Sequence, residues 1–137
     1  MKKNLGLYLH IPFCVKKCAY CDFLSFSADD SIKQCYVEKL CSEIKERSVF
    51  FKEYCVDTIF FGGGTPSLLQ NRQIRQLMRV IHQSFCITKD VEITMEANPG
   101  TVDYEKLVVM KESGINRISF GVQSFLEQEL KLLGRIH

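Results

Sequence analysis

Three cysteines lie close together near the N-terminus of the chain. Cys14, Cys18 and Cys21 are arranged as C-x3-C-x2-C within a segment short enough to be one loop. Thiolates at short, unequal intervals hold iron–sulfur clusters, whereas a structural zinc site normally takes four protein ligands and closes its tetrahedron. No fourth cysteine follows closely. The spacing therefore indicates a metal site with three thiolate ligands and one open position.

Two other interpretations of these cysteines stay open at this level. Positions 14, 18 and 21 are also i, i+4 and i+7, so the thiols would form one buried stripe if the segment were helical. Pro12 and the flanking aromatic residues disfavour that helix. The other interpretation is an interaction protein with a structural zinc, which would bind one ion in place of a cluster.

The segments around these cysteines alternate between the hydrophobic periods of strands and helices. Residues 5 to 11 alternate as a strand does and lead directly into the cysteine segment, and Asp29 to Gln34 carry helix-capping residues. The pattern predicts four strands, at 5 to 11, 55 to 61, 91 to 96 and 115 to 120. It also predicts four helices, at about 31 to 52, at 74 to 85, from Thr101 or Asp103 to Gly114, and from Leu126 onward.

Strands that alternate with helices require crossover connections, so this order predicts an α/β fold with a parallel sheet. Ligands in such folds gather beyond the C-terminal ends of the strands. The unusual residues all fall there, because the cysteines follow the first strand, Gly62 to Gly64 follow the second, Glu96 ends the third and Gln123 follows the fourth. We expect these residues to line one site.

Composition narrows the class of protein. The chain of 137 residues is 46% hydrophobic and 25% charged, which is typical of one soluble globular domain. A net charge of +2 does not indicate a nucleic-acid partner. Seven cysteines, an odd count, with no apolar leader favour a reducing cytoplasmic location. No apolar run approaches the roughly 20 residues that span a bilayer, so we expect no transmembrane segment.

Four stretches carry a resemblance to a known family. HIPFCVKKCAYCDF at 10 to 23, FFGGGTPSLL at 60 to 69, MEANPGT at 95 to 101 and NRISFGVQSF at 116 to 125 resemble, in the same order, the radical S-adenosylmethionine (SAM) proteins of the oxygen-independent coproporphyrinogen III oxidase group. The resemblance implies a partial (β/α)6 TIM-like barrel, of which residues 1–137 would be the N-terminal four βα units. We therefore expect an N-terminal fragment, with residues 134 to 137 beginning a further connection and the remaining units absent.

The resemblance also implies the cofactors and their ligands. Cys14, Cys18 and Cys21 would hold a [4Fe–4S] cluster whose open iron binds SAM through its amino and carboxylate groups. The residues implied to bind SAM or a neighbouring ligand are Tyr8, Tyr20, Gly63, Gly64, Thr65, Glu96, Gln123 and Arg135, the last two at a second SAM or the substrate. Glu96 has an alternative role as a salt-bridged core residue, and Tyr8 as plain packing. Cys35, Cys41, Cys55 and Cys86 are interpreted as small apolar residues without chemistry.

Two functions remain within the family. The oxidase has a further cysteine two residues after the third ligand, whereas this chain has Phe23 there. Together with ANPGT and GVQSF, this departure resembles the HemW-type heme chaperones, which bind heme and hand it to acceptor proteins. The alternative is a radical enzyme that oxidatively decarboxylates the propionates of a porphyrinogen. The sequence singles out no heme ligand, since His10 and His82 are equally compatible with packing or surface positions.

Overall fold

The computed structural model of this chain describes residues 2–135, so the expectation for Ile136 and His137 lies outside the described residues. Helices and strands alternate, with short 3-10 helices, labelled η, after α1 and β2. The elements are β1 Lys3–Ile11, α1 Asp30–Ser48, η1 Val49–Phe51, β2 Tyr54–Gly63, η2 Pro66–Leu68, α2 Asn71–Ser84, β3 Cys86–Ala97, α3 Tyr104–Glu112, β4 Arg117–Phe120 and α4 Glu127–Leu132.

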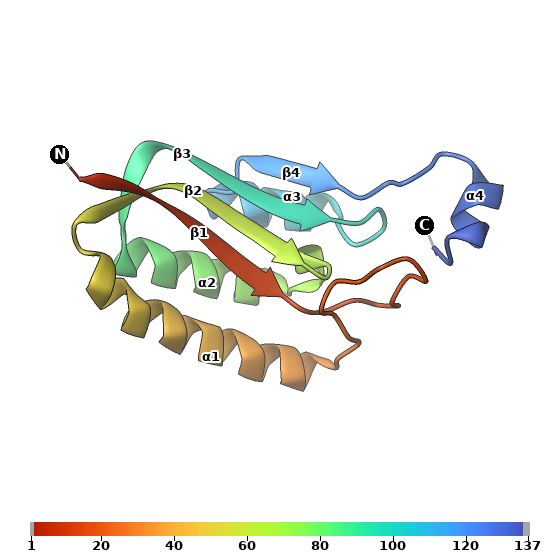
Figure 1. Ribbon diagram of the computed structural model, residues 1–137, viewed down its shortest axis with the longest axis horizontal. Helices are drawn as coiled ribbons and strands as arrows, with labels where there is room; N and C mark the ends of the chain where they lie inside the picture. The colour runs from red at the N-terminus through yellow and green to blue at the C-terminus, as the bar shows by residue number, and fades with distance from the viewer. Residues whose placement is uncertain (1, 136–137) are drawn as a thin grey trace.

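The four strands form one parallel sheet in the order β1-β2-β3-β4, which confirms the predicted α/β fold. Parallel neighbours that follow one another in the chain need a crossover helix each time, and α1, α2 and α3 supply it. In Figure 1 the strand arrows point to the same end of the sheet, where the segment after β1 and helix α4 lie. Helices α1 and α2 run along one face (Figure 1).

The hydrophobic core lies between the sheet and these helices. Alternate strand residues turn toward the helices, as a period of two requires. Helix α2 contributes an apolar face with the expected spacing of three and four residues. The most buried members of this core include Ile11, Phe13, Val37, Val56, Phe61, Ile74, Leu77, Ile81 and Met95.

The second face of the sheet carries mostly polar and aromatic side chains. The parallel register places Tyr8 beside Phe60, Phe60 beside Thr94, and Thr94 beside Arg117 in one row. Arg117 donates from Nη1 to the Thr94 hydroxyl at 3.2 Å. This face would be the interior of a barrel, and it leads directly to the strand ends where the unusual residues gather.

Helix boundaries follow from their capping residues. The Asp29 side chain accepts from the Ile32 amide at 2.9 Å and caps the start of α1, within the segment of capping residues that the sequence showed. The helix ends at Ser48 and continues as the 3-10 turn η1, so the predicted extent to residue 52 is wrong. Asp103 caps α3, and Gly114 with φ +97° follows its end, as expected.

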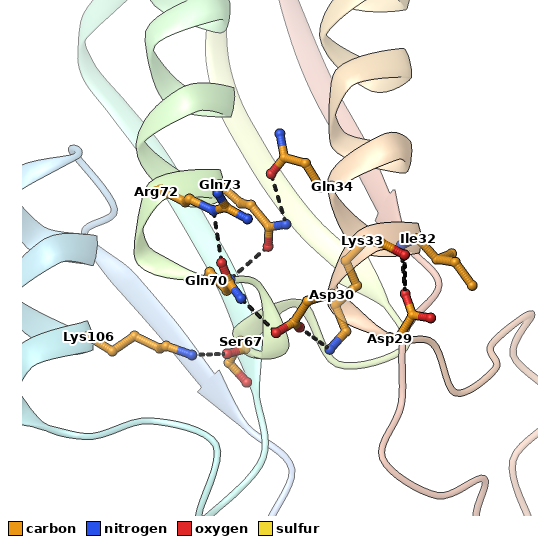
Figure 2. Close-up of polar contacts among 11 residues, drawn as sticks. Asp29, Asp30, Ile32, Lys33, Gln34, Ser67, Gln70, Arg72, Gln73 and Lys106 are labelled. Atoms are coloured by element: carbon orange, nitrogen blue, oxygen red, sulfur yellow. Dashed lines mark hydrogen bonds and ion pairs between the residues drawn. The ribbon is translucent and has the colours of Figure 1, made fainter.

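A polar network joins the starts of α1 and α2 near the C-terminal end of the sheet (Figure 2). The Gln70 side chain donates to Asp30 at 2.8 Å. Gln73, which is fully buried, donates to Gln34 at 3.2 Å and accepts from the Gln70 amide at 2.8 Å. Because both polar groups of this buried amide have partners, the network fixes α2 against α1 at modest desolvation cost.

Two of the cysteines that we interpreted as having no chemistry are joined in a disulfide. Cys55 and Cys86 are register partners near the starts of β2 and β3, and their sulfurs are bonded. The expectation for this pair is wrong because β3 begins at Cys86 rather than at residue 91. The longer strand places Cys86 next to Cys55 of β2. This bond lies at the end of the strands opposite to the cysteine segment.

Candidate functional site

The segment after β1 forms a closed loop rather than a helix. Within this part of the structure no helix occurs between β1 and α1, so the helical-stripe interpretation of the three cysteines is wrong. The loop is closed at its base, where the Cys14 amide donates to the Phe26 carbonyl at 3.0 Å and the Phe26 amide donates to the Pro12 carbonyl at 2.8 Å. All three thiols are free and half-buried.

The loop faces the ends of the other strands across a cleft of about 710 Å³. The cleft brings together the three cysteines and all but one of the other predicted site residues, although they come from four strand ends and from the residues after α4. Its lining includes Cys14, Cys18, Cys21, Tyr20, Gly63, Gly64, Thr65, Glu96, Gln123 and Arg135. Tyr8 is absent from this lining, is 60% exposed, and lies on the open face of the sheet.

All three thiols line the cleft. Among residues 2–135, no three Cys, His, Asp or Glu side chains converge where one metal ion could sit. A structural zinc needs four ligands about 2.0 to 2.3 Å from a single ion. A cluster of several irons distributes its thiolates over separate metal atoms.

The glycines after β2 allow the cysteine loop to pack closely. A Cβ on Gly64 would lie 2.6 Å from the Phe13 carbonyl oxygen, and one on Gly63 would lie 2.7 Å from the His10 ring. Gly63 also has φ +112°, which a side chain rarely permits. The Gly64 amide donates to the Ile11 carbonyl at 2.8 Å. The glycines therefore have a protein-packing role in addition to the predicted approach to a ligand.

Glu96 at the end of β3 is a half-buried carboxylate beside Tyr8. Burial raises the pKa of Glu96, and the backbone amide of Gly63, which donates a hydrogen bond to the carboxylate, opposes that rise. Although the Tyr8 side chain is largely exposed, partial desolvation and the nearby charge of Glu96 raise its pKa. None of the ion pairs among the described residues includes Glu96, so its alternative role as a salt-bridged core residue lacks a partner.

Arg135 joins the loop to the far side of the cleft. Its guanidinium approaches Cys18 Sγ at 4.0 Å and also donates to the Gly121 carbonyl after β4. Tyr20 lies in the same group, and its pKa is raised by burial and by a hydrogen bond with Cys18, while the Arg135 charge lowers it. The positive charge of Arg135 thus lies next to one thiol and one phenol of the cleft.

Gln123 follows β4 with φ +65°, a left-handed conformation that is uncommon outside glycine. Backbone strain of this kind occurs often at ligand-binding positions. Gln123 lines the cleft as predicted.

Asn98 is a cleft residue that sequence reasoning missed. Its side-chain amide donates to the Thr65 hydroxyl at 3.0 Å and its oxygen accepts from Arg135 at 3.5 Å. In the sequence Asn98 appears only within the stretch MEANPGT, directly after the strand predicted at 91 to 96. The position of Asn98 at a predicted strand end was the signal that could have marked it.

The donor types of this cleft suit a thiolate-bound cluster with an additional small ligand. Three free thiols come from one loop, and a carboxylate, an amide and a guanidinium surround the remaining space. Fold and site together define a parallel α/β protein with a thiol-lined cofactor cleft at the C-terminal ends of its strands.

Comparison with known families places the chain more narrowly. The model of the Radical SAM superfamily matches residues 8–137. The chain therefore belongs to the radical SAM superfamily, and this membership implies an iron–sulfur cluster and SAM as cofactors.

Similar proteins include named heme chaperones. The chain is 46% identical over 134 residues to the heme chaperone HemW of Escherichia coli strain K12, covering 97% of this chain and 35% of that protein. It is 39% identical to the heme chaperone HemW of Bacillus subtilis strain 168, covering 95% of this chain and 35% of that protein. The chain thus spans about a third of the length of these relatives.

The fold also matches a solved structure. The coproporphyrinogen III oxidase HemN from Escherichia coli, described as a radical SAM enzyme, superposes with a TM-score of 0.91 at 33% identity, covering 99% of this chain and 31% of that one. The match confirms the expectation of part of a TIM-like radical SAM fold. The described residues contain no helix that is long and apolar enough to cross a membrane.

Proposed function

We propose that this chain contains the cluster- and SAM-binding part of a heme chaperone of the oxygen-independent coproporphyrinogen III oxidase group. Residues 1–137 would correspond to four βα units of a six-unit radical SAM core. The observation that carries the proposal is the 46% identity to a named heme chaperone over 97% of the chain, together with the thiol-lined cleft at the strand ends.

The residues of the cleft have distinct proposed roles. Cys14, Cys18 and Cys21 hold a [4Fe–4S] cluster and leave one iron open for SAM. When bound, these cofactors supply one-electron chemistry, while the protein binds and orients them. Glu96 would accept a hydrogen bond from bound SAM, because a half-buried carboxylate is stabilised by a donor.

The remaining cleft residues would surround SAM and a second ligand. Gly63, Gly64 and Thr65 form one wall beside the loop, and Tyr20 lies next to the thiol of Cys18. Gln123, which follows β4, and Arg135, which follows α4, line another side of the cleft. A second SAM or a tetrapyrrole would bind on that side. Tyr8 does not line the cleft, so it would contribute to SAM binding only indirectly, through its electrostatic interaction with Glu96.

Heme is the proposed cargo, and heme-acceptor proteins are the proposed partners. The chaperone proposal is supported by the names of the relatives and by Phe23, which occupies the position where the oxidase group has a further cysteine. A reducing cytoplasm suits the five free thiols of the described residues.

The second candidate is a coproporphyrinogen oxidase, favoured by the superposition on HemN at a TM-score of 0.91. Such an enzyme would decarboxylate the propionates of a porphyrinogen. The two candidates share the cofactors and differ in what happens to the tetrapyrrole.

Two assays on anaerobically reconstituted protein separate the candidates, with the Escherichia coli heme chaperone as the positive control. The first follows heme transfer to an apo-acceptor by absorbance. The second follows loss of coproporphyrinogen in the presence of SAM and a reductant. In a protein of the length of these relatives, of which this chain covers about a third, we expect heme binding and transfer without porphyrinogen loss, and in residues 1–137 alone we expect neither activity. Porphyrinogen turnover would favour the oxidase, and about one zinc per chain with no iron would contradict the cluster itself.

A further inference from the structure

The hydroxyl of Thr65 lies 3.7 Å from Cys14 Sγ. The two residues are far apart in the chain and meet because β2 ends beside the cysteine loop. The contact is held from the backbone as well, since the Thr65 amide donates to the Phe13 carbonyl at 2.6 Å. Thr65 is only 3% exposed. Water therefore competes weakly for this hydroxyl.

Asn98 sets the direction of this contact. Its Nδ2 donates to Thr65 Oγ1 at 3.0 Å, and its Oδ1 accepts from the Arg135 guanidinium at 3.5 Å, which fixes the orientation of the amide. With an oxygen lone pair of Thr65 engaged by Asn98, the hydroxyl hydrogen is left to point at Cys14. A thiolate sulfur has no hydrogen to donate, so in a metal-bound state Thr65 must be the donor.

Asn98 is itself held in place. The Thr101 hydroxyl donates to the Asn98 carbonyl at 2.6 Å and accepts from the Asn98 amide at 3.3 Å. The Lys106 ammonium donates to the Ser67 carbonyl at 2.7 Å, which ties α3 to the turn that follows Thr65 (Figure 2). The hydrogen-bond chain from Asn98 to Cys14 is therefore preorganised before a cofactor binds.

We infer that Thr65, oriented by Asn98, donates a hydrogen bond to the Cys14 thiolate and thereby raises the reduction potential of the cluster that this thiolate holds. The inference rests on the proposed cluster site. A reduced cluster carries one more negative charge than an oxidised one, so a hydrogen-bond donor at a ligand sulfur stabilises the reduced state more. Hydrogen bonds to the sulfurs are among the factors that set the potential of a cluster.

The inference assigns Thr65 a role that differs from a SAM contact. The contacts of its side-chain oxygen are Asn98 and Cys14, both within the protein. Thr65 and Asn98 are thus positioning residues for a ligand sulfur. Their effect should appear in the cluster alone, without SAM or heme.

The test is a redox titration of the reconstituted protein, with iron and sulfide content measured on each sample. Thr65→Val removes the hydroxyl at nearly constant volume, and Thr65→Ser retains it. We expect Thr65→Val to lower the equilibrium constant for reduction about tenfold, equivalent to about 59 mV for a one-electron couple. Thr65→Ser should stay close to the parent. Asn98→Ala should shift the potential in the same direction by less, because the hydroxyl remains but loses its orientation.

Several outcomes would overturn the inference. A Thr65→Val protein with parental iron content and parental potential would do so, as would a Thr65→Ser protein that shifts as far as the valine variant. If Thr65→Val takes up no iron, Asn98→Ala decides, and an unchanged potential in that variant counts against the inference. A parent protein without any cluster would remove the proposed function as well, whereas equal potentials in cluster-loaded samples would remove this inference alone.

Discussion

The imidazole of His10 donates from Nε2 to the Leu24 carbonyl oxygen at 2.9 Å. A carbonyl oxygen can only accept, so the neutral ring carries its hydrogen on Nε2 and leaves Nδ1 as an acceptor for the Tyr8 hydroxyl at 3.2 Å. His10 therefore connects the end of β1 to the segment that follows the third cysteine of the loop. Its ring also packs against Gly63, where a side chain would collide with it.

Loss of the His10 contact should loosen the cysteine loop. We predict that His10→Ala increases the rate of iron loss to a chelator about fivefold, since one hydrogen bond contributes about 1 kcal/mol. His82→Ala serves as the matched control, because His82 is an exposed residue on α2. Iron release from reconstituted protein, followed by absorbance, measures both. Equal release rates in the His10 and His82 variants would contradict a positioning role for His10.

The cysteines divide into ligands and non-ligands. We predict that alanine at Cys14, Cys18 or Cys21 abolishes the [4Fe–4S] cluster, because each removes one of only three protein ligands. The same change at Cys35, Cys41 or Cys86 should leave it, since these residues lie on α1 or at the opposite end of β3.

Iron and sulfide content after anaerobic reconstitution distinguishes the two groups. Loss of the cluster in Cys41→Ala with retention in Cys18→Ala would show that the ligand assignment is wrong.

Glu96→Gln should have opposite effects on the stability of the protein and on its affinity for SAM. Because burial raises the pKa of Glu96 in the folded state, protonation favours folding, and this contribution is present below the unfolded value of 4.5 and lost as the pH rises through the folded pKa. At pH 7 the charged group is therefore unfavourable in the free protein. We predict that Glu96→Gln has a higher melting temperature than the parent at pH 7, and that the difference shrinks as the pH falls through the folded pKa toward 4.5.

The same variant should bind SAM about 10- to 100-fold more weakly, since a hydrogen bond to a charged group contributes roughly 1.5 to 3 kcal/mol. Thermal melts across this pH range and SAM titrations of the loaded protein measure the two effects. A variant that loses its iron would show a structural role for Glu96 in place of a SAM contact.

Phe13 connects the core to the cysteine loop. It is fully buried and packs edge-on against Phe26 and Tyr36, at centroid distances of 5.6 and 5.3 Å. We predict that Phe13→Ala lowers the free energy of unfolding by about 3 to 5 kcal/mol, as expected for a buried phenylalanine. Phe50→Ala is the control, since Phe50 is 79% exposed and its loss should cost less than about 0.5 kcal/mol. Denaturant titrations compare the two, and equal losses would contradict the burial of Phe13.

Hydrophobic period was sufficient to predict the order of the elements but not their ends. Alternation at 91 to 96 identified the centre of β3, whereas Cys86 to Asp90 lack that alternation and still belong to the strand. The register between β2 and β3 shifts after Val56, an irregularity that no single strand sequence encodes. For the same reason the bond between Cys55 and Cys86 could not be foreseen. Val49, Phe50 and Phe51 continue the apolar pattern of α1 but adopt a 3-10 turn.

The site was predictable to the extent that chain topology places residues at strand ends. The cysteines, the glycines and Glu96 each lie at the end of a predicted strand. In the structure all of them line one cleft. The roles of Asn98 and His10 depend on contacts between segments distant in sequence, such as Asn98 with Thr65. Such contacts become visible only once the strands are in register.

The interaction between the cluster and SAM tests the central claim most directly. The claim is that Cys14, Cys18 and Cys21 hold a cluster with one iron open to SAM in the cleft. Electron paramagnetic resonance of the reduced, reconstituted protein should change when saturating SAM is added, and the change should be weaker at equal SAM in Glu96→Gln. An unchanged spectrum in a sample shown to contain the cluster would contradict the claim.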